Sequence, residues 1–175
     1  MKKIVSGITI QCVRGNIANQ KGIDAVVNAA NAWLRPGGGV AGAIHSAAGP
    51  GLVEECLPLA PIKPGQAVIT GGHNLPNRYV IHCLGPVYGK DEPSDELLAN
   101  CYRNALKLAE EYKLNSIAFS AISTGAFGYP AEEAAQVVLK TLKEMIPQLK
   151  SVKNIIFVLR NDHKAKIFED TLANI

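Results

Sequence analysis

The amino-acid sequence predicts a three-layer α/β/α protein in which a mixed sheet of about six strands lies between helices. One observation is the stretch Ala25–Asn28, which is too apolar for a strand with one solvated face and therefore indicates a strand covered on both sides. Another is the second half of the chain, where strand patterns alternate with amphipathic helix patterns. The third is the glycine cluster Gly37–Gly39, which separates the buried strand from an alanine-rich helix, Val40–Ala48. In sheets of this kind, ligands bind to loops that follow the carboxyl ends of strands.

The first third of the chain contains two further predicted elements. Residues Ile8–Arg14 alternate apolar and polar side chains with the period of two that is typical of a half-buried strand. This strand leads directly into Gly15–Ile17, which we therefore place at the edge of the sheet. Residues Pro50–Leu59 are expected to form a short helix that ends at Pro58 and Pro61, because proline cannot extend a helix.

The rest of the chain alternates predicted strands and helices. Ser94 can cap a helix whose apolar residues recur at spacings of three or four. Pro130 suits the first position of another helix, because that position needs no N–H group, and Asp162 is expected to cap a terminal helix that runs to Asn174. The remaining strands are predicted at Gln66–Thr70, Tyr79–Leu84, Ser116–Ile122 and Asn154–Leu159.

Length and composition indicate one ordinary globular domain that covers residues 1–175. Hydrophobic residues make up 47% of the chain and charged residues 19%, which is typical of a protein with a real core. The net charge of +3 is too small to predict a nucleic-acid partner. The N-terminus has two lysines but no sustained apolar run after them, so we expect neither a signal peptide nor a membrane partner. We expect a cytoplasmic monomer.

The four cysteines do not predict a metal centre. Cys12, Cys56, Cys83 and Cys101 are too far apart for a C-x-x-C motif, and most of them fall within strand or helix patterns, where cysteine packs as a small hydrophobic residue. We therefore expect reduced thiols, no bound metal and no cofactor.

The glycine cluster also matches the G-x-G-x-x-G phosphate motif of dinucleotide-binding folds, through Gly37, Gly39 and Gly42. In those folds the first glycine directly follows a strand, and an acidic residue about 20 positions further on binds a ribose hydroxyl. Here the segment NAANAWLRP lies between the strand and the glycines, and the next acidic residues, Glu54 and Glu55, fall inside a predicted helix. This spacing argues against an oxidoreductase.

Four motifs, in this order along the chain, resemble those of the macro domain family of ADP-ribose-binding modules and MacroD-like ADP-ribosyl hydrolases. They are Asn28–Asn31 (NAAN), Gly37–His45 (GGGVAGAIH), Leu75–His82 (LPNRYVIH) and Ile122–Pro130 (ISTGAFGYP). The resemblance spans nearly the whole chain and implies a protein that binds ADP-ribose. Two glycine-bearing loops that face each other suit a diphosphate, because backbone N–H groups can neutralise its charge without lysines.

The resemblance also implies roles for individual residues. Asn31 would bind the distal ribose, since its amide both donates and accepts hydrogen bonds, and Phe127 would pack against the same ribose. Asn16 stands where the family usually has an aspartate that accepts a hydrogen bond from the adenine amino group, and Arg160 could stack on the adenine. The alternatives are structural: Asn28 satisfies loop backbone, Phe127 packs in the core and Arg160 is solvated. The expected ligand-binding residues are Asn16, Ile17, Asn28, Asn31, Gly37, Gly38, Gly39, Val40, Ser123, Thr124, Gly125, Ala126, Phe127 and Arg160.

Position 41 separates two functional hypotheses. MacroD-type members often carry an aspartate directly after Gly-Gly-Gly-Val that is thought to position or activate water, whereas this chain has Ala41. With no side-chain nucleophile evident, we expect water to attack the distal ribose of an ADP-ribosyl ester, on a modified acidic side chain or in O-acetyl-ADP-ribose, and Asn31 to position it. His45 is the other candidate catalytic residue, because it lies four positions after Ala41 on the predicted helix. The alternative is a reader that binds ADP-ribose and releases it unchanged.

Overall fold

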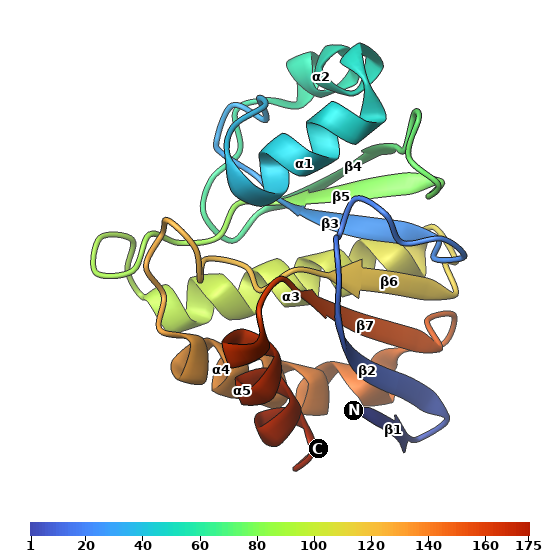
Figure 1. Cartoon of the computed structure of the whole chain (residues 1–175), viewed down its shortest axis with the longest axis vertical. Helices are drawn as coiled ribbons and strands as arrows, with labels where there is room; N and C mark the ends of the chain where they lie inside the picture. Colours follow the sequence, from blue (N-terminus) through green and yellow to red (C-terminus); the bar gives the residue numbers. More distant parts are fainter.

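The computed structural model describes residues 1–175 and contains one seven-stranded sheet between helices (Figure 1). The strands, in chain order, are β1 (Lys2–Val5), β2 (Ile8–Arg14), β3 (Ala25–Ala29), β4 (Ala67–Gly71), β5 (Tyr79–Cys83), β6 (Ser116–Phe119) and β7 (Asn154–Leu159). Their order across the sheet is β1-β2-β7-β6-β3-β5-β4. Strands β2, β7, β6, β3 and β5 run parallel, while β1 and β4 pair antiparallel with their neighbours. The predicted α/β class and mixed sheet are confirmed.

The strand that the sequence did not predict is β1. It pairs with β2 across a tight turn at Ser6 and Gly7, whose φ angles are 52° and 80°. Two consecutive residues with positive φ form the hairpin turn that matches the twist of the flanking strands. Four residues are too few to show a clear alternation, so only the pairing with β2 identifies this strand.

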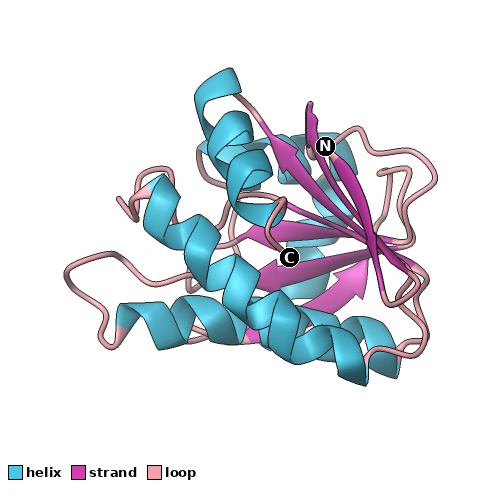
Figure 2. Ribbon diagram, turned by 90° about the horizontal axis from the view of Figure 1, so that it is seen from below, coloured by secondary structure: helices cyan, strands magenta, loops and turns pink.

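The helices cover both faces of the sheet (Figure 2). On one face lie α1 (Gly39–Ala48) and α2 (Pro50–Cys56), and on the other lie α3 (Ser94–Glu111), α4 (Ala131–Met145) and α5 (Asp162–Leu172), with short 3-10 turns at Leu57–Leu59 and Ile146–Gln148. Strand β7 shows why the central strands are apolar throughout: Ile155 and Phe157 belong to the core under α3–α5, and Ile156 and Val158 to the core on the other face. Burial on both faces is typical of parallel strands.

Two predicted helix caps are wrong by one residue. Ser94 is the first residue of α3, and the preceding Pro93 takes the extended N-cap conformation. At α5 the cap is Asn161, whose side chain accepts a hydrogen bond from the backbone N–H of Lys164 at 2.8 Å, so Asp162 lies inside the helix. Both caps depend on backbone angles that the residue types alone do not determine.

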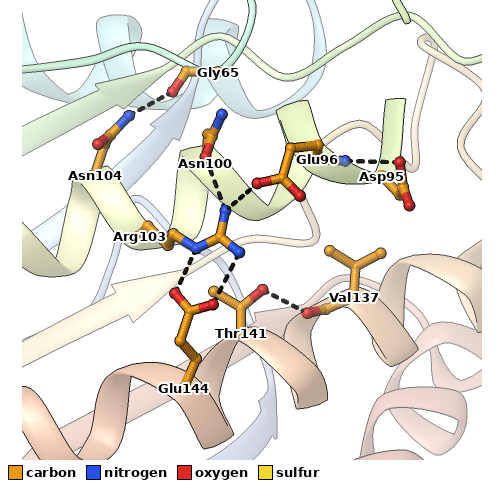
Figure 3. Close-up of polar contacts among 9 residues, drawn as sticks. All are labelled: Gly65, Asp95, Glu96, Asn100, Arg103, Asn104, Val137, Thr141 and Glu144. Carbon is orange, nitrogen blue, oxygen red and sulfur yellow. Dashed lines mark hydrogen bonds and ion pairs between the residues drawn. The ribbon is translucent and has the colours of Figure 1, made fainter. Parts of the chain in front are cut away.

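A charged network joins α3 to α4 (Figure 3). The guanidinium of Arg103 donates to both carboxylate oxygens of Glu144, at 2.6 and 3.0 Å, and to Glu96 and Asn100 at 2.7 and 2.9 Å. The carboxylate of Glu144 raises the pKa of Arg103, and Arg103 in turn lowers the pKa of Glu144. A bidentate pair of this kind fixes the relative position of the two helices.

The parallel strands all point their carboxyl ends toward the same end of the sheet. The loops that follow β3, β5 and β6 gather there (Figure 1). The geometry of these three loops therefore defines where a ligand can bind.

None of the helices is both long and apolar enough to cross a membrane.

Candidate functional site

A cleft of about 360 Å³ lies between the loop that precedes α1 and the loop that follows β6. No charged side chain lines it. The lining residues are Ala29, Ala30, Asn31, Gly37, Gly38, Gly39, Val40, Ala41, Gly85, Ala121, Ile122, Ser123, Gly125, Ala126 and Phe127. Any affinity for an anion must therefore come from uncharged donors, chiefly backbone N–H groups.

The first wall of the cleft is the N-terminus of α1. Its cap, Gly38, provides no side chain, and the backbone N–H groups of Gly39, Val40 and Ala41 have no acceptor within the protein. Two features require glycine here: Gly39 has a φ of 55°, and a Cβ atom on Gly42 would overlap the carbonyl oxygen of Gly37. Free N–H groups and the positive end of the helix dipole favour a negatively charged ligand.

The second wall is the loop Ser123–Phe127. Ser123 has a φ of 67°, its hydroxyl donates to the carbonyl oxygen of Pro86 at 2.8 Å, and its own carbonyl accepts the N–H of Tyr129 at 2.9 Å. Within this anchored loop the N–H groups of Gly125, Ala126 and Phe127 have no acceptor in the protein. The cleft therefore has unpaired donors on both walls.

Asn31 lines the cleft and also holds the first loop together. Its Oδ1 accepts the backbone N–H of Arg35 at 3.0 Å, and its Nδ2 donates to the carbonyl oxygen of Arg35 at 2.8 Å. A side-chain amide has two N–H donors and two acceptor lone pairs, so one of each remains for a ligand. The structural and the ligand-binding interpretations of Asn31 are thus compatible.

Asn28 and His45 are predicted site residues that do not line the cleft. Asn28 lies on the same face of β3 as Val26, under α1, and is fully buried. Its amide donates to Nδ1 of His82 at 3.1 Å, and Nε2 of His82 then donates to the hydroxyl of Thr70 at 2.9 Å. Because Asn28 bonds within this buried chain, it stabilises the packing of β3 under α1.

His45 lies beside this buried chain, on the inner face of α1. Its side chain is only 6% exposed, and its ring centroid is 6.4 Å from that of His82. Burial lowers the pKa of His45, and burial together with the neighbouring His45 lowers the pKa of His82 to about 3. Both rings are therefore neutral near pH 7. The His45 ring does not line the cleft, and neither of its ring nitrogens has a hydrogen-bond partner in the protein.

Four other predicted residues also lie outside the cleft lining. The Oδ1 atom of Asn16 accepts the backbone N–H of Ala18 at 2.9 Å, Ile17 is buried, and Arg160 is exposed after the end of β7. Strands β2 and β7 lie beyond β6 in the sheet, so these residues sit beside the cleft. Thr124 points its hydroxyl inward, to the carbonyl oxygen of Ala121 at 2.8 Å.

Comparisons with known proteins agree with this geometry. A family model of the Macro domain matches residues 27–138. The chain belongs to the macro domain family. It is 46% identical over 167 residues to a macro domain-containing protein of Methanosarcina mazei, covering 95% of this chain and 89% of the relative. It is 43% identical over 169 residues to the O-acetyl-ADP-ribose deacetylase of Salmonella typhimurium, covering 94% of each. The Oceanobacillus iheyensis macrodomain, solved with ADP, superposes with a TM-score of 0.94 at 39% identity, over 99% of this chain and 95% of that one.

The macro domain cleft contains residues that the sequence analysis did not assign to the ligand. Ala29 ends β3 and Ala30 follows it, Ala121 and Ile122 follow β6, and Gly85 follows β5. A Cβ atom on Gly85 would overlap the hydroxyl of Ser123, which explains the glycine. The sequence could have indicated all five, because each lies within three residues of the end of a parallel strand.

No side chain that titrates near pH 7 lines the cleft of this macro domain. Ala41, the third residue of α1, contributes a methyl group there and is 6% exposed. No group of three or more His, Cys, Asp or Glu residues is close enough together to hold a metal ion, and the four cysteines are free and buried. The arrangement can bind an anion and position water, but it contains no carboxylate or imidazole that could act as a general base.

Proposed function

We propose that this macro domain binds ADP-ribose in the cleft between the N-terminus of α1 and the loop Ser123–Phe127. The observation that carries the proposal is the presence of unpaired backbone N–H groups on both walls of a cleft without charged side chains. A diphosphate has oxygens on both of its phosphorus atoms and can accept from both walls at once. The Oceanobacillus relative solved with ADP, and the Salmonella relative named for O-acetyl-ADP-ribose, support this ligand.

The proposed reaction is hydrolysis of an ADP-ribosyl ester, either on a modified acidic side chain of a protein or in O-acetyl-ADP-ribose. Water adds to the distal-ribose carbon that carries the ester, the bond between that carbon and the ester oxygen breaks, the carboxylate leaves, and the proton that the water loses passes to solvent. Asn31 has one free amide N–H and one free acceptor position with which to hold a ribose hydroxyl. The phosphate of the ligand holds the water, and this orientation lowers the barrier without a side-chain base.

The second candidate function is a reader that binds ADP-ribose and does not change it. The methyl group of Ala41 at the cleft favours this function, because a positioned general base contributes about 10²- to 10⁴-fold to a rate and none is present here. The two functions share the cleft and differ only in turnover.

Two measurements test these functions. Calorimetry should show tighter binding of ADP-ribose than of AMP or NAD, because the cleft is expected to contact both the diphosphate and an unblocked distal ribose. Single-turnover assays on a glutamate-ADP-ribosylated protein and on O-acetyl-ADP-ribose should show slow cleavage. Binding without any turnover would establish the reader. Equal affinities for AMP and ADP-ribose would contradict the proposed ligand.

The cytoplasmic location and the monomeric state stay predictions. Light scattering after size-exclusion chromatography would test the second, and a mass of twice 18.6 kDa would overturn it.

A further inference from the structure

Lys164 reaches the cleft loop from a distant part of the chain. It lies in the first turn of α5, and its Nζ donates to the carbonyl oxygen of Thr124 at 3.0 Å. The cap of that helix, Asn161, accepts the backbone N–H of the same residue at 2.8 Å. The side chain of Lys164 is half-buried and does not line the cleft.

The contact determines the orientation of one particular peptide group. The carbonyl of Thr124 belongs to the same peptide as the N–H of Gly125, and this peptide is trans. In a trans peptide the C=O and N–H bonds point in opposite directions. With Lys164 on the carbonyl side, the N–H of Gly125 points away from α5.

The N–H of Gly125 is one of the unpaired donors of the cleft. Gly125 lines the cleft, and no atom of the protein accepts its hydrogen bond. The donors of Thr124 itself are both used elsewhere, since its N–H and its hydroxyl each bond to the carbonyl oxygen of Ala121, at 3.2 and 2.8 Å. The Lys164 ammonium is therefore the contact that fixes this peptide plane from outside the loop.

We propose that Lys164 is a positioning residue for the anion-binding loop: it orients and polarises the Thr124–Gly125 peptide so that the Gly125 N–H donates to a phosphate oxygen of the ligand. The inference rests on the proposed function. A hydrogen bond from an ammonium group is about twice as strong as a neutral one, and a bond to the carbonyl oxygen strengthens the N–H donor of the same peptide. The positive charge acts on the anion through this peptide and not by direct contact.

The experiment compares Lys164→Met with a matched control on the same helix. Lys166→Met removes the same charge from α5, but the Lys166 side chain is 78% exposed and pairs only with Asp170, at 3.2 Å. Lys164→Arg keeps a charged donor and serves as the rescue variant. Calorimetry should show ADP-ribose binding about 2- to 12-fold weaker in Lys164→Met, the range for one net hydrogen bond. The control and the rescue variant should bind nearly as wild type does.

Nuclear magnetic resonance reads the proposed orientation directly. In the free protein, Lys164→Met should shift the ¹⁵N resonance of Gly125, because that shift depends on the hydrogen bond to the preceding carbonyl. On addition of ADP-ribose, the Gly125 amide proton should move downfield in wild type and in Lys166→Met, and less in Lys164→Met. An equal loss of affinity in both methionine variants would show an effect of charge alone and overturn the proposal.

Failure of this inference is distinguishable from failure of the proposed function. If wild type does not bind ADP-ribose, the proposed function fails, and inorganic pyrophosphate then replaces it as the probe of the Gly125 amide. If ADP-ribose binds and the Gly125 resonances are the same in wild type and Lys164→Met, then Lys164 does not orient the peptide. A variant that loses affinity only because the fold is destabilised would show a lower Tm and shifts throughout the loop, which would also refute the specific role.

Discussion

Replacing Ala41 with aspartate is expected to raise turnover by at least about tenfold at neutral pH. The methyl group of Ala41 lines the cleft in the first turn of α1, and helical side chains lean toward the N-terminus, so a carboxylate there would point toward the bound anion and its water. A positioned general base contributes about 10²- to 10⁴-fold. The N-terminus of α1 stabilises the charged carboxylate and makes it a weaker base. We therefore expect a rate increase at or below the low end of this range.

The same substitution should weaken the binding of ADP-ribose. Position 41 is two residues into the helix, about 3 Å along its axis, so the new carboxylate would lie about 7 Å from an anion held by the first N–H groups. Two unit charges at that distance, in a medium of effective dielectric constant about 20, repel each other by roughly 2 kcal/mol. We therefore expect an affinity about thirtyfold lower.

Single-turnover rate and dissociation constant must be measured on the same variants. Ala41→Asn has nearly the same shape without the charge, and Ala47→Asp places the charge at an exposed position of the same helix. Only Ala41→Asp should be faster than wild type. If Ala41→Asp binds substrate and is no faster than Ala41→Asn, then position 41 does not face the reacting carbon and the geometric reasoning fails.

Other predictions address the cleft and the fold. Gly125→Val should keep the fold, because a Cβ atom there meets no protein atom within 4 Å, yet abolish ADP-ribose binding by filling the cleft; retained affinity in calorimetry would contradict this. Asn31→Ala should lower turnover roughly 5- to 150-fold through an unpaired ribose hydroxyl, and also lower Tm because the amide bonds Arg35; unchanged kinetics would remove Asn31 from the site. Burial lowers the pKa of His82 in the folded protein from 6.5 to about 3. Between these pH values His82 is protonated in the unfolded chain but not in the folded protein, so a falling pH favours unfolding. Denaturant titrations should then show the free energy of unfolding falling by about 2 kcal/mol from pH 8 to pH 5, and less in His82→Gln; an equal slope in both would refute the assignment. Arg103→Met should cost about 1 to 2 kcal/mol of stability, less in 1 M salt, and a salt-independent loss would mean that packing and not charge is responsible.

The class of the fold and the proposed place of the ligand followed from local patterns. Apolar runs such as Ile155–Leu159 indicate strands buried on both faces, and they do so without knowledge of their neighbours. The glycine-bearing loops after two of these strands indicated the carboxyl end of the sheet as the binding site. Both inferences need only short stretches of sequence, because strand period and glycine backbone freedom are local properties.

Only the tertiary structure decided which side chains face the cleft. Asn28 and Asn31 are three residues apart in one motif. Asn28 lies within β3, and its side chain is buried under α1. Asn31 follows the strand and lines the cleft. His45 shares α1 with Ala41 but faces the buried chain of polar groups at His82. Which face of a strand or helix meets the ligand depends on where the element ends and on what packs against it.

Contacts between distant segments could not be predicted from the sequence for the same reason. Gly85 must be glycine because Ser123 approaches it, and Lys164 reaches the carbonyl of Thr124 from another helix. Sequence by itself determined the kind of fold, the family resemblance and the loops that we propose to bind ADP-ribose. The close approach of those loops, and the direction in which each backbone N–H points, arise only when the sheet brings the ends of its strands together.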